Sequence, residues 1–364
     1  MPTLTPDDVL QALAAVADPD LGKDLVSLNF VRDIAVTADN IVSLRVTLTS
    51  PASPHKIALS QAVNDALLAL GAKRIDLTLA ADPPQRTGKL PSVRHIVGVG
   101  AGKGGVGKST VAVNLAVSLF KAGAKVGLLD ADIYGPSVPI MLGLRGRKPS
   151  VNAARKIIPA EAHGIKCISM GFMVQDDMAV AWRGPMVGRA VTQFIDDVDW
   201  GELDFLIVDL PPGTGDIILS LCQAIPLSGA IVVSTPQDVA FADVLRAVRM
   251  FSMLKVEVMG LVENMSYFHC PDNGKNYQIF GPSNSPNNCA AHDLTLLGQL
   301  PLDMLVSPNA DAGMPIVVAE PLSLQTEIYN GIAAKIVSKL AILGHKDDER
   351  AQVGKGFFTT RPPA

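Results

Sequence analysis

The sequence has no apolar run of about 18 residues, the length that a membrane-spanning helix requires. Its first residues also lack the basic and apolar regions of a signal peptide, which predicts a cytoplasmic protein with no membrane partner. A basic surplus is missing too, because 31 Lys and Arg stand against 35 Asp and Glu and give a net charge of −4. Nucleic-acid binding needs a basic face, so this balance argues against a nucleic-acid partner.

Cysteine is scarce, with four residues in a chain of 364. They are too few and too scattered for the disulfide framework of a small secreted protein, so we expect reduced thiols. Cys167 and Cys222 lie within apolar strand and helix patterns and are expected in the core, whereas Cys270 and Cys289 remain candidates for metal ligands. A hydrophobic content of 48% with 18% charged residues is typical of a globular chain with a large core.

The chain divides into four parts by composition. Residues 1–81 predict a small α+β domain, with helices over 7–16 and 56–71 and strands over 29–36, 41–48 and 74–79. Residues 82–93 are rich in proline and polar residues and predict a linker. Residues 94–343 form the large domain, and the polar residues 344–364 are expected to be a flexible tail.

The large domain alternates short apolar runs with helical patterns. The runs cover residues 95–99, 126–130, 205–209, 229–233 and 258–262. Strands that are apolar on both faces belong to a parallel sheet covered by helices. The sequence therefore predicts an α/β domain with a mostly parallel sheet flanked by helices.

A glycine-rich motif follows the first of these runs and precedes a helical pattern. It reads Gly102, Lys103, Gly104, Gly105, Val106, Gly107, Lys108, Ser109, Thr110. This order satisfies G-x-x-x-x-G-K-[ST], the phosphate-binding loop or P-loop, in the strand–loop–helix context that the motif requires. Glycines let backbone N–H groups turn toward phosphates, Lys108 places a charge on the β- and γ-phosphates, and the Ser109 hydroxyl is a Mg²⁺ ligand. ATP and Mg²⁺ are the expected cofactors.

Acidic residues end two of the apolar runs. Asp130 ends one run and Asp132 follows it closely, and Asp209 ends another. Because the carboxyl ends of parallel strands open on one edge of the sheet, these side chains should lie beside the P-loop. Asp209 is then placed to hold Mg²⁺, Asp132 to orient or deprotonate the attacking water, and Asp130 to hold the turn or assist with the metal. An isolated Asp at a strand end is often only a cap.

Several stretches together resemble the Mrp/ApbC family of ATP-dependent iron–sulfur cluster carriers. This family belongs to the deviant Walker A ATPases, which include the MinD, ParA and nitrogenase iron-protein lineages. The matching stretches are residues 102–110, 130–137, 182–186, 204–216, 234–237 and 262–266. Residues 18–22 and 24–28 resemble the small domain that is fused to many bacterial carriers and shared with iron–sulfur assembly factors.

The resemblance implies a P-loop ATPase that works as a nucleotide-sandwich homodimer and hydrolyses ATP slowly. Lys103 would then reach across to the partner's nucleotide, although a solvated loop lysine is the alternative. Asn264 and residues 301–303 lie where adenine contacts occur in similar proteins, and an ordinary turn asparagine is the other interpretation of Asn264. The loop 210–216 is expected to sense the γ-phosphate as a switch. Acceptor apoproteins and assembly scaffold proteins are the implied partners.

The chain departs from the family at the cysteines. A C-x-x-C usually follows the 262–266 stretch, so that two subunits supply the four thiolates of a [4Fe–4S] cluster. Here Cys270 is present and Asn273 stands at the second position, while Ser53 replaces a cysteine of the small domain. Cys270 is therefore the candidate metal ligand, either paired with Cys289 or left as a structurally neutral thiol.

Three functions follow from these observations. The first is an ATPase that loads iron–sulfur clusters onto acceptor apoproteins, and the second is a metal-free regulator or scaffold of the same family. The third, a positioning ATPase like ParA or MinD, needs a basic DNA-binding face or an amphipathic membrane helix. The net charge and the mixed charge of residues 344–350 argue against the third function.

Overall fold

The computed structural model describes residues 3–83, 88–133, 135–172 and 192–357, with side chains as far as residue 346. The chain forms two compact units. One contains the residues up to Pro83 together with those from Val337 onward, and the other contains the intervening residues up to Ile336. The predicted motif stretch 182–186 lies outside the described residues.

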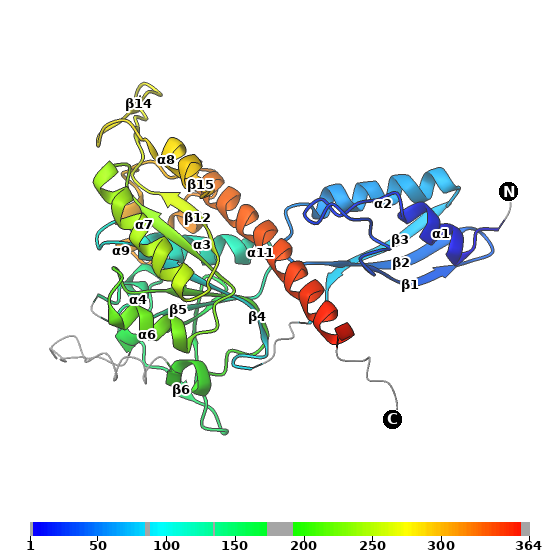
Figure 1. Ribbon diagram of the computed structural model, residues 1–364, viewed down its shortest axis with the longest axis horizontal. Coiled ribbons are helices and arrows are strands. Elements are labelled where there is room, and N and C mark those ends of the chain that lie inside the picture. Colours follow the sequence, from blue (N-terminus) through cyan, green and yellow to red (C-terminus); the bar gives the residue numbers. More distant parts are fainter. Residues whose placement is uncertain (1–2, 84–87, 134, 173–191, 358–364) are drawn as a thin grey trace. The chain divides into compact units, whose positions relative to one another are not determined.

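The first unit contains a three-stranded sheet and two helices, as the sequence predicts (Figure 1). Its elements are α1 (Pro6–Leu13), β1 (Val31–Val36), β2 (Ile41–Leu48), α2 (Lys56–Leu70) and β3 (Arg74–Ala81). Strand β2 is central, antiparallel to β1 and parallel to β3. Helix α1 begins at a capping box, in which the Asp8 side chain accepts from the Thr5 N–H at 2.8 Å and the Thr5 hydroxyl accepts from the Asp8 N–H.

The second unit is built on an eight-stranded sheet with the order β15-β12-β11-β4-β10-β5-β9-β8. Every adjacent pair is parallel except β8 and β9. The strands are β4 (Val93–Gly100), β5 (Val126–Asp130), β8 (Ala160–Ala162), β9 (Ile165–Ser169), β10 (Leu203–Asp209), β11 (Gly229–Ser234), β12 (Val258–Glu263) and β15 (Leu296–Gln299). The predicted parallel sheet of an α/β domain is confirmed, and its five predicted strands are β4, β5, β10, β11 and β12.

Helices flank this sheet (Figure 1). They are α3 (Lys108–Lys121), α4 (Val138–Met141), α6 (Asp216–Ala224), α7 (Asp238–Met253), α8 (Ser285–Ala291), α9 (Val306–Asp311), α10 (Ile316–Ala319) and the first part of α11 (Leu324–Phe357), with a 3₁₀ turn η1 (Met170–Phe172). The residues of α11 from Val337 onward belong to the first unit. Two small hairpins pair β6 (Ser150–Val151) with β7 (Ile157–Ile158), and β13 (Phe268–His269) with β14 (Asn276–Tyr277). Within the described ranges, no helix is both long and apolar enough to cross a membrane.

Helix α11 differs from the sequence expectation. Residues 344–364 are expected to be a loose tail, but the backbone of α11 is helical as far as Phe357. The polar residues 345–353 include Lys, Glu, Arg, Ala and Gln, which are good helix formers. A helix that is already nucleated in an apolar segment propagates through such residues at little cost.

Candidate nucleotide site

The P-loop connects the end of β4 to the first residue of α3. Gly105 and Gly107 have left-handed φ angles of 80° and 82°, which glycine adopts without strain. A Cβ at Gly107 would lie 2.2 Å from Nδ2 of Asn264, and one at Gly102 would lie 2.4 Å from the backbone oxygen of Asp243 in α7. The glycines at the two ends of the motif are therefore fixed by close packing as well as by backbone conformation.

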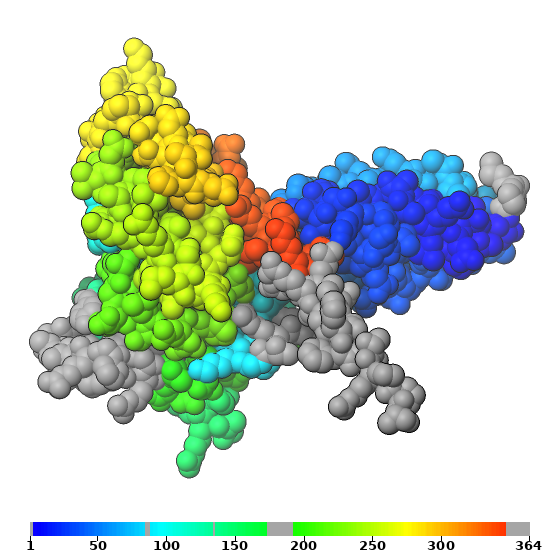
Figure 2. All heavy atoms as spheres, viewed as in Figure 1, coloured from blue at the N-terminus to red at the C-terminus, as the bar shows by residue number. Residues whose placement is uncertain are grey.

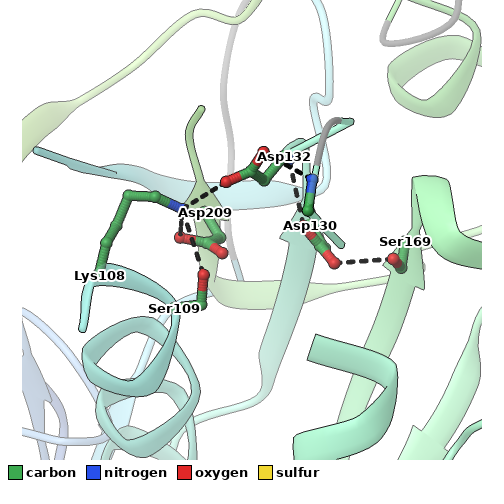
Figure 3. Close-up of polar contacts among 7 residues, drawn as sticks. Lys108, Ser109, Asp130, Asp132, Ser169 and Asp209 are labelled. Carbon is green, nitrogen blue, oxygen red and sulfur yellow. Dashed lines mark hydrogen bonds and ion pairs between the residues drawn. The ribbon is translucent and has the colours of Figure 1, made fainter. Parts of the chain in front are cut away.

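Lys108 lies at the centre of a group of carboxylates at the carboxyl edge of the sheet (Figure 3). Its side chain is only 6% exposed. The Nζ atom lies 2.5 Å from Oδ1 of Asp209 and 3.4 Å from Oδ2 of Asp132, and it donates to the Ser109 hydroxyl at 3.2 Å. The fold thus brings together four residues that the sequence predicted for one site.

Asp130 is fully buried beside this group and organises the turn after β5. Its Oδ1 accepts from the backbone N–H of Asp132 at 3.1 Å, and its Oδ2 accepts from the Ser169 hydroxyl at 2.8 Å (Figure 3). Burial, together with the charge of Asp209, raises the pKa of Asp130 to about 8. Through these two contacts Asp130 joins the backbone of Asp132 to the end of β9. Ser169 ends β9, and no sequence motif identified it.

Asp209 has the properties of a metal ligand. It ends β10, where it pairs in register with Asp130 of β5 and Val99 of β4. Burial raises the pKa of Asp209, and the nearby charge of Lys108 opposes this rise. Its Oδ2 atom is buried and has no hydrogen-bond partner among the described residues. A buried carboxylate oxygen beside a serine hydroxyl is the all-oxygen donor set that Mg²⁺ prefers, so these residues fit the ion.

A pocket of about 360 Å³ adjoins the P-loop. Its lining includes Gly107, Asn264, Pro301, Leu302 and Asp303, so all the positions predicted for adenine contacts meet here. The Asn264 side chain donates from Nδ2 to the backbone oxygen of Val106 at 2.9 Å, which ties the end of β12 to the P-loop.

Two further lining residues, Gln325 and Tyr329, come from α11. Gln325 is buried and donates to the backbone oxygen of Pro301, while Tyr329 is one of the largest fully buried side chains. No sequence motif indicated either of them, because only the packing of α11 brings them to a loop some two hundred residues earlier in the chain.

Lys103 and its neighbours Gly104 and Gly105 are exposed. Lys103 belongs to no ion pair within the described part of the chain. Its position contrasts with that of Lys108, which is buried and paired with two acids. The two lysines of the motif therefore have different environments.

Cys270 lies in the turn of the β13–β14 hairpin and is half-buried. Its N–H donates to the Lys275 carbonyl at 3.0 Å, and its carbonyl accepts from the Gly274 N–H at 2.9 Å. Asn273 stabilises the same turn, since its Oδ1 accepts from the Lys275 N–H and its Nδ2 donates to the Tyr277 hydroxyl. In the described ranges, no three His, Cys, Asp or Glu side chains are grouped as metal ligands.

The other three thiols are buried. Cys289 of α8 is 2% exposed and belongs to the core of the second unit. Burial raises the pKa of Cys289 to about 11 and that of Cys222 to about 12, and it also raises the pKa of Cys167. The core positions expected for Cys167 and Cys222 are confirmed. Cys289 thus lies in the core, whereas Cys270 is half-buried in a hairpin turn.

Comparison with known proteins gives two profile matches. Residues 92–337 match the NUBPL iron-transfer P-loop NTPases, and residues 6–76 match an iron–sulfur cluster assembly protein family. The iron–sulfur cluster carrier protein of Deinococcus radiodurans is 46% identical over 338 residues, which cover 92% of this chain and 96% of that protein. The carrier of the same name from Synechocystis is 43% identical, over 93% of this chain and 99% of its own length.

Solved structures resemble about two thirds of this chain. A nucleotide-binding protein from Archaeoglobus fulgidus in complex with ADP is 36% identical, with a TM-score of 0.58 over 66% of this chain and 93% of that chain. The cell-division ATPase MinD of Pyrococcus furiosus is 21% identical, with a TM-score of 0.51 over 66% of this chain and 98% of its own, and shares the fold.

Proposed function

Because this chain belongs to the family of NUBPL-type iron-transfer P-loop NTPases, we propose that it is an ATP-dependent carrier that binds iron–sulfur clusters and delivers them to acceptor apoproteins. Relatives that match over nine-tenths of the chain are named iron–sulfur cluster carriers, which supports this cargo. The match of residues 6–76 to an assembly-protein family supports scaffold proteins as further partners in this proposal.

The group formed by Lys108, Asp209 and Asp132 is the observation that carries the ATPase part of the proposal. Lys108 binds the β- and γ-phosphates, while Ser109 and Asp209 hold Mg²⁺. When bound, Mg²⁺ supplies Lewis-acid stabilisation of charge on the phosphate oxygens. Asp132, held by Asp130, orients the attacking water and accepts its proton.

A second copy of the chain completes the site in this proposal. Lys103 is exposed and has no ion pair among the described residues of its own chain, which suits a lysine that acts on the nucleotide of a partner. Its positive charge would stabilise the transferred phosphoryl group in trans, as an arginine finger does. Hydrolysis is slow until this contact forms, and its role is to change the dimer rather than to process a substrate.

The cluster is the cargo, and Cys270 is its proposed ligand. A half-buried thiol in a hairpin turn can meet the same thiol of a second copy. Asn273 favours a second candidate function, a metal-free regulator that retains the ATP switch. Its side chain is committed to the hairpin by two hydrogen bonds and is not a thiolate.

Anaerobic purification followed by iron and sulfide analysis separates the two candidates. A carrier retains equal amounts of iron and sulfide, and Cys270→Ser loses both while its affinity for MgADP stays within about twofold of the parent. Protein that binds MgADP normally but contains neither iron nor sulfide after reconstitution is the regulator. Lys108→Ala is the matched control for the nucleotide site, because it removes nucleotide binding and leaves Cys270 intact.

A further inference from the structure

In the second unit, the carboxylate of one residue links the two ends of a long loop. The chain leaves the sheet at Glu263, forms the β13–β14 hairpin that carries Cys270, and comes back to the Glu263 side chain at Ser283, just before α8 begins. Oε2 of Glu263 accepts from the Ser283 hydroxyl at 2.7 Å, and Oε1 accepts from Nε2 of Gln299 at 2.9 Å. Figure 2 shows this hairpin as a yellow projection from the surface of its unit.

The burial of Glu263 calls for a physical reason. The side chain is 0% exposed, and among the described residues it forms hydrogen bonds to neutral groups rather than an ion pair. Burying a carboxylate is costly, and an apolar side chain would fill the same space more favourably. What the carboxylate adds is two acceptor atoms, one for the sheet at Gln299 and one for the base of the hairpin at Ser283.

The next residue in the chain belongs to the nucleotide site. Asn264 donates from its side chain to the Val106 carbonyl of the P-loop and from its N–H to the Ser234 carbonyl of β11. Met265 adopts a left-handed φ of 56° and lines the same pocket as Asn264. Consecutive residues therefore contact the P-loop, the pocket and the base of the Cys270 hairpin.

We propose that Glu263 is a positioning residue that fixes the Cys270 hairpin to the nucleotide pocket, so that the nucleotide in the pocket sets the exposure of Cys270. This inference rests on the proposed function, in which Cys270 holds the cargo and the nucleotide governs its release. The bond from Ser283 to Glu263 carries the connection, because among the described residues it joins this carboxylate directly to the returning end of the hairpin.

Alkylation of Cys270 measures the connection directly. The other three thiols are buried with raised pKa values, so N-ethylmaleimide reacts first at Cys270, and Cys270→Ser gives the background. The rate is compared between MgADP and Mg²⁺ with a nonhydrolysable ATP analogue. Two protein concentrations are used, because protection by a second copy depends on concentration and a connection within one chain does not.

Ser283→Ala and Gln299→Ala each remove one hydrogen-bond donor from the same carboxylate. Gln299→Ala also removes a longer bond of 3.4 Å to the Ser283 hydroxyl, but it leaves the 2.7 Å bond from Ser283 to Glu263 in place. We expect the rates in the two nucleotides to differ by about fivefold in the parent and in Gln299→Ala, and by less than about twofold in Ser283→Ala. Glu263→Ala should lose the difference too. Glu263→Gln should restore it, because its amide can donate to Ser283 and accept from Gln299.

The proposal is overturned if the two nucleotides change the alkylation rate equally in Ser283→Ala and Gln299→Ala. It is also overturned if the alkylation rate of the parent protein is the same in both nucleotides. Thermal unfolding of each variant identifies any that do not fold. The result is independent of the cargo. Protein that holds no iron but shows the expected alkylation pattern refutes the carrier function and supports the connection. Protein that holds iron but lacks this alkylation pattern supports the carrier function and refutes the connection.

Discussion

Three glycines of the P-loop differ in what a methyl group would meet, and alanine substitution at each separates steric from conformational constraint. At Gly102 the added Cβ lies 2.4 Å from the Asp243 backbone oxygen, a contact that only a shift of α7 relieves. At Gly105 nothing lies within 4 Å, but the φ angle is 80°. At Gly104 the nearest atom is Pro212 Cγ at 4.0 Å, and the backbone is not left-handed.

The expected order of stability follows from these contacts. Gly102→Ala should lower the free energy of unfolding by about 3 kcal/mol, the upper end for overpacking, because the obstacle is backbone. Gly105→Ala should lower it by about 1–2 kcal/mol, the cost of a left-handed alanine. Gly104→Ala should raise it by about 0.4–1 kcal/mol through the lower entropy of the unfolded chain.

Urea unfolding followed by tryptophan fluorescence measures these differences in the second unit alone. Both tryptophans, Trp182 and Trp200, fall in that part of the sequence, and Trp200 is buried. The measurement is made without nucleotide, so that contacts of the loop with phosphate do not contribute. A Gly102→Ala protein as stable as Gly104→Ala would refute the packing of the P-loop against α7.

Three other changes test the site and the first unit. Lys103→Ala should leave MgATP affinity within about twofold but lower the ATPase rate by about 10³-fold, as expected for a group that acts in trans; a normal rate in a steady-state assay would contradict that role. Cys289→Ala should leave the iron content of reconstituted protein unchanged, because Cys289 is a core residue, and a loss of iron would make it a ligand. Burial raises the pKa of Asp18 above its ordinary value of about 4, although the N–H groups of Leu21 and Asp20 oppose the rise. The stability that protonated Asp18 contributes is therefore complete below pH ~4 and is lost as the pH rises through the raised pKa. Asp18→Asn should accordingly gain stability over the parent from pH 4 to pH 7 in calorimetry. If the stability difference between the two proteins does not change with pH, the raised pKa of Asp18 does not contribute.

The central part of the site could be predicted from sequence because it depends on strand ends. Asp130 and Asp209 follow continuous apolar runs, and parallel strands bring their carboxyl ends to one edge whatever their order in the sheet. The P-loop is recognised from the spacing of its residues, and close packing accounts for its two outer glycines, Gly102 and Gly107. The contacts of Lys108 with Asp132 and Asp209 could therefore be predicted without any knowledge of the loops between these residues.

Residues that depend on irregular strands and distant packing could not be predicted. Ser169 ends β9, whose apolar pattern is interrupted by Lys166, and the amine of Lys166 donates to the Trp200 carbonyl. Tyr329 reaches the pocket only through the path of α11. Glu263 has the same sequence appearance as any acid after an apolar run, and only its burial and its two donors distinguish it.

The contacts of Lys108 with Asp209 and Asp132 also bear on which form of nucleotide the protein can accept. A triphosphate that recruits this amine competes with two acids that already neutralise it. If the amine moves to the phosphates, Asp209 keeps a charge in an environment that disfavours anions, unless a cation arrives with the ligand. We therefore expect the protein to bind ATP with its metal ion far more tightly than free ATP in a chelating buffer.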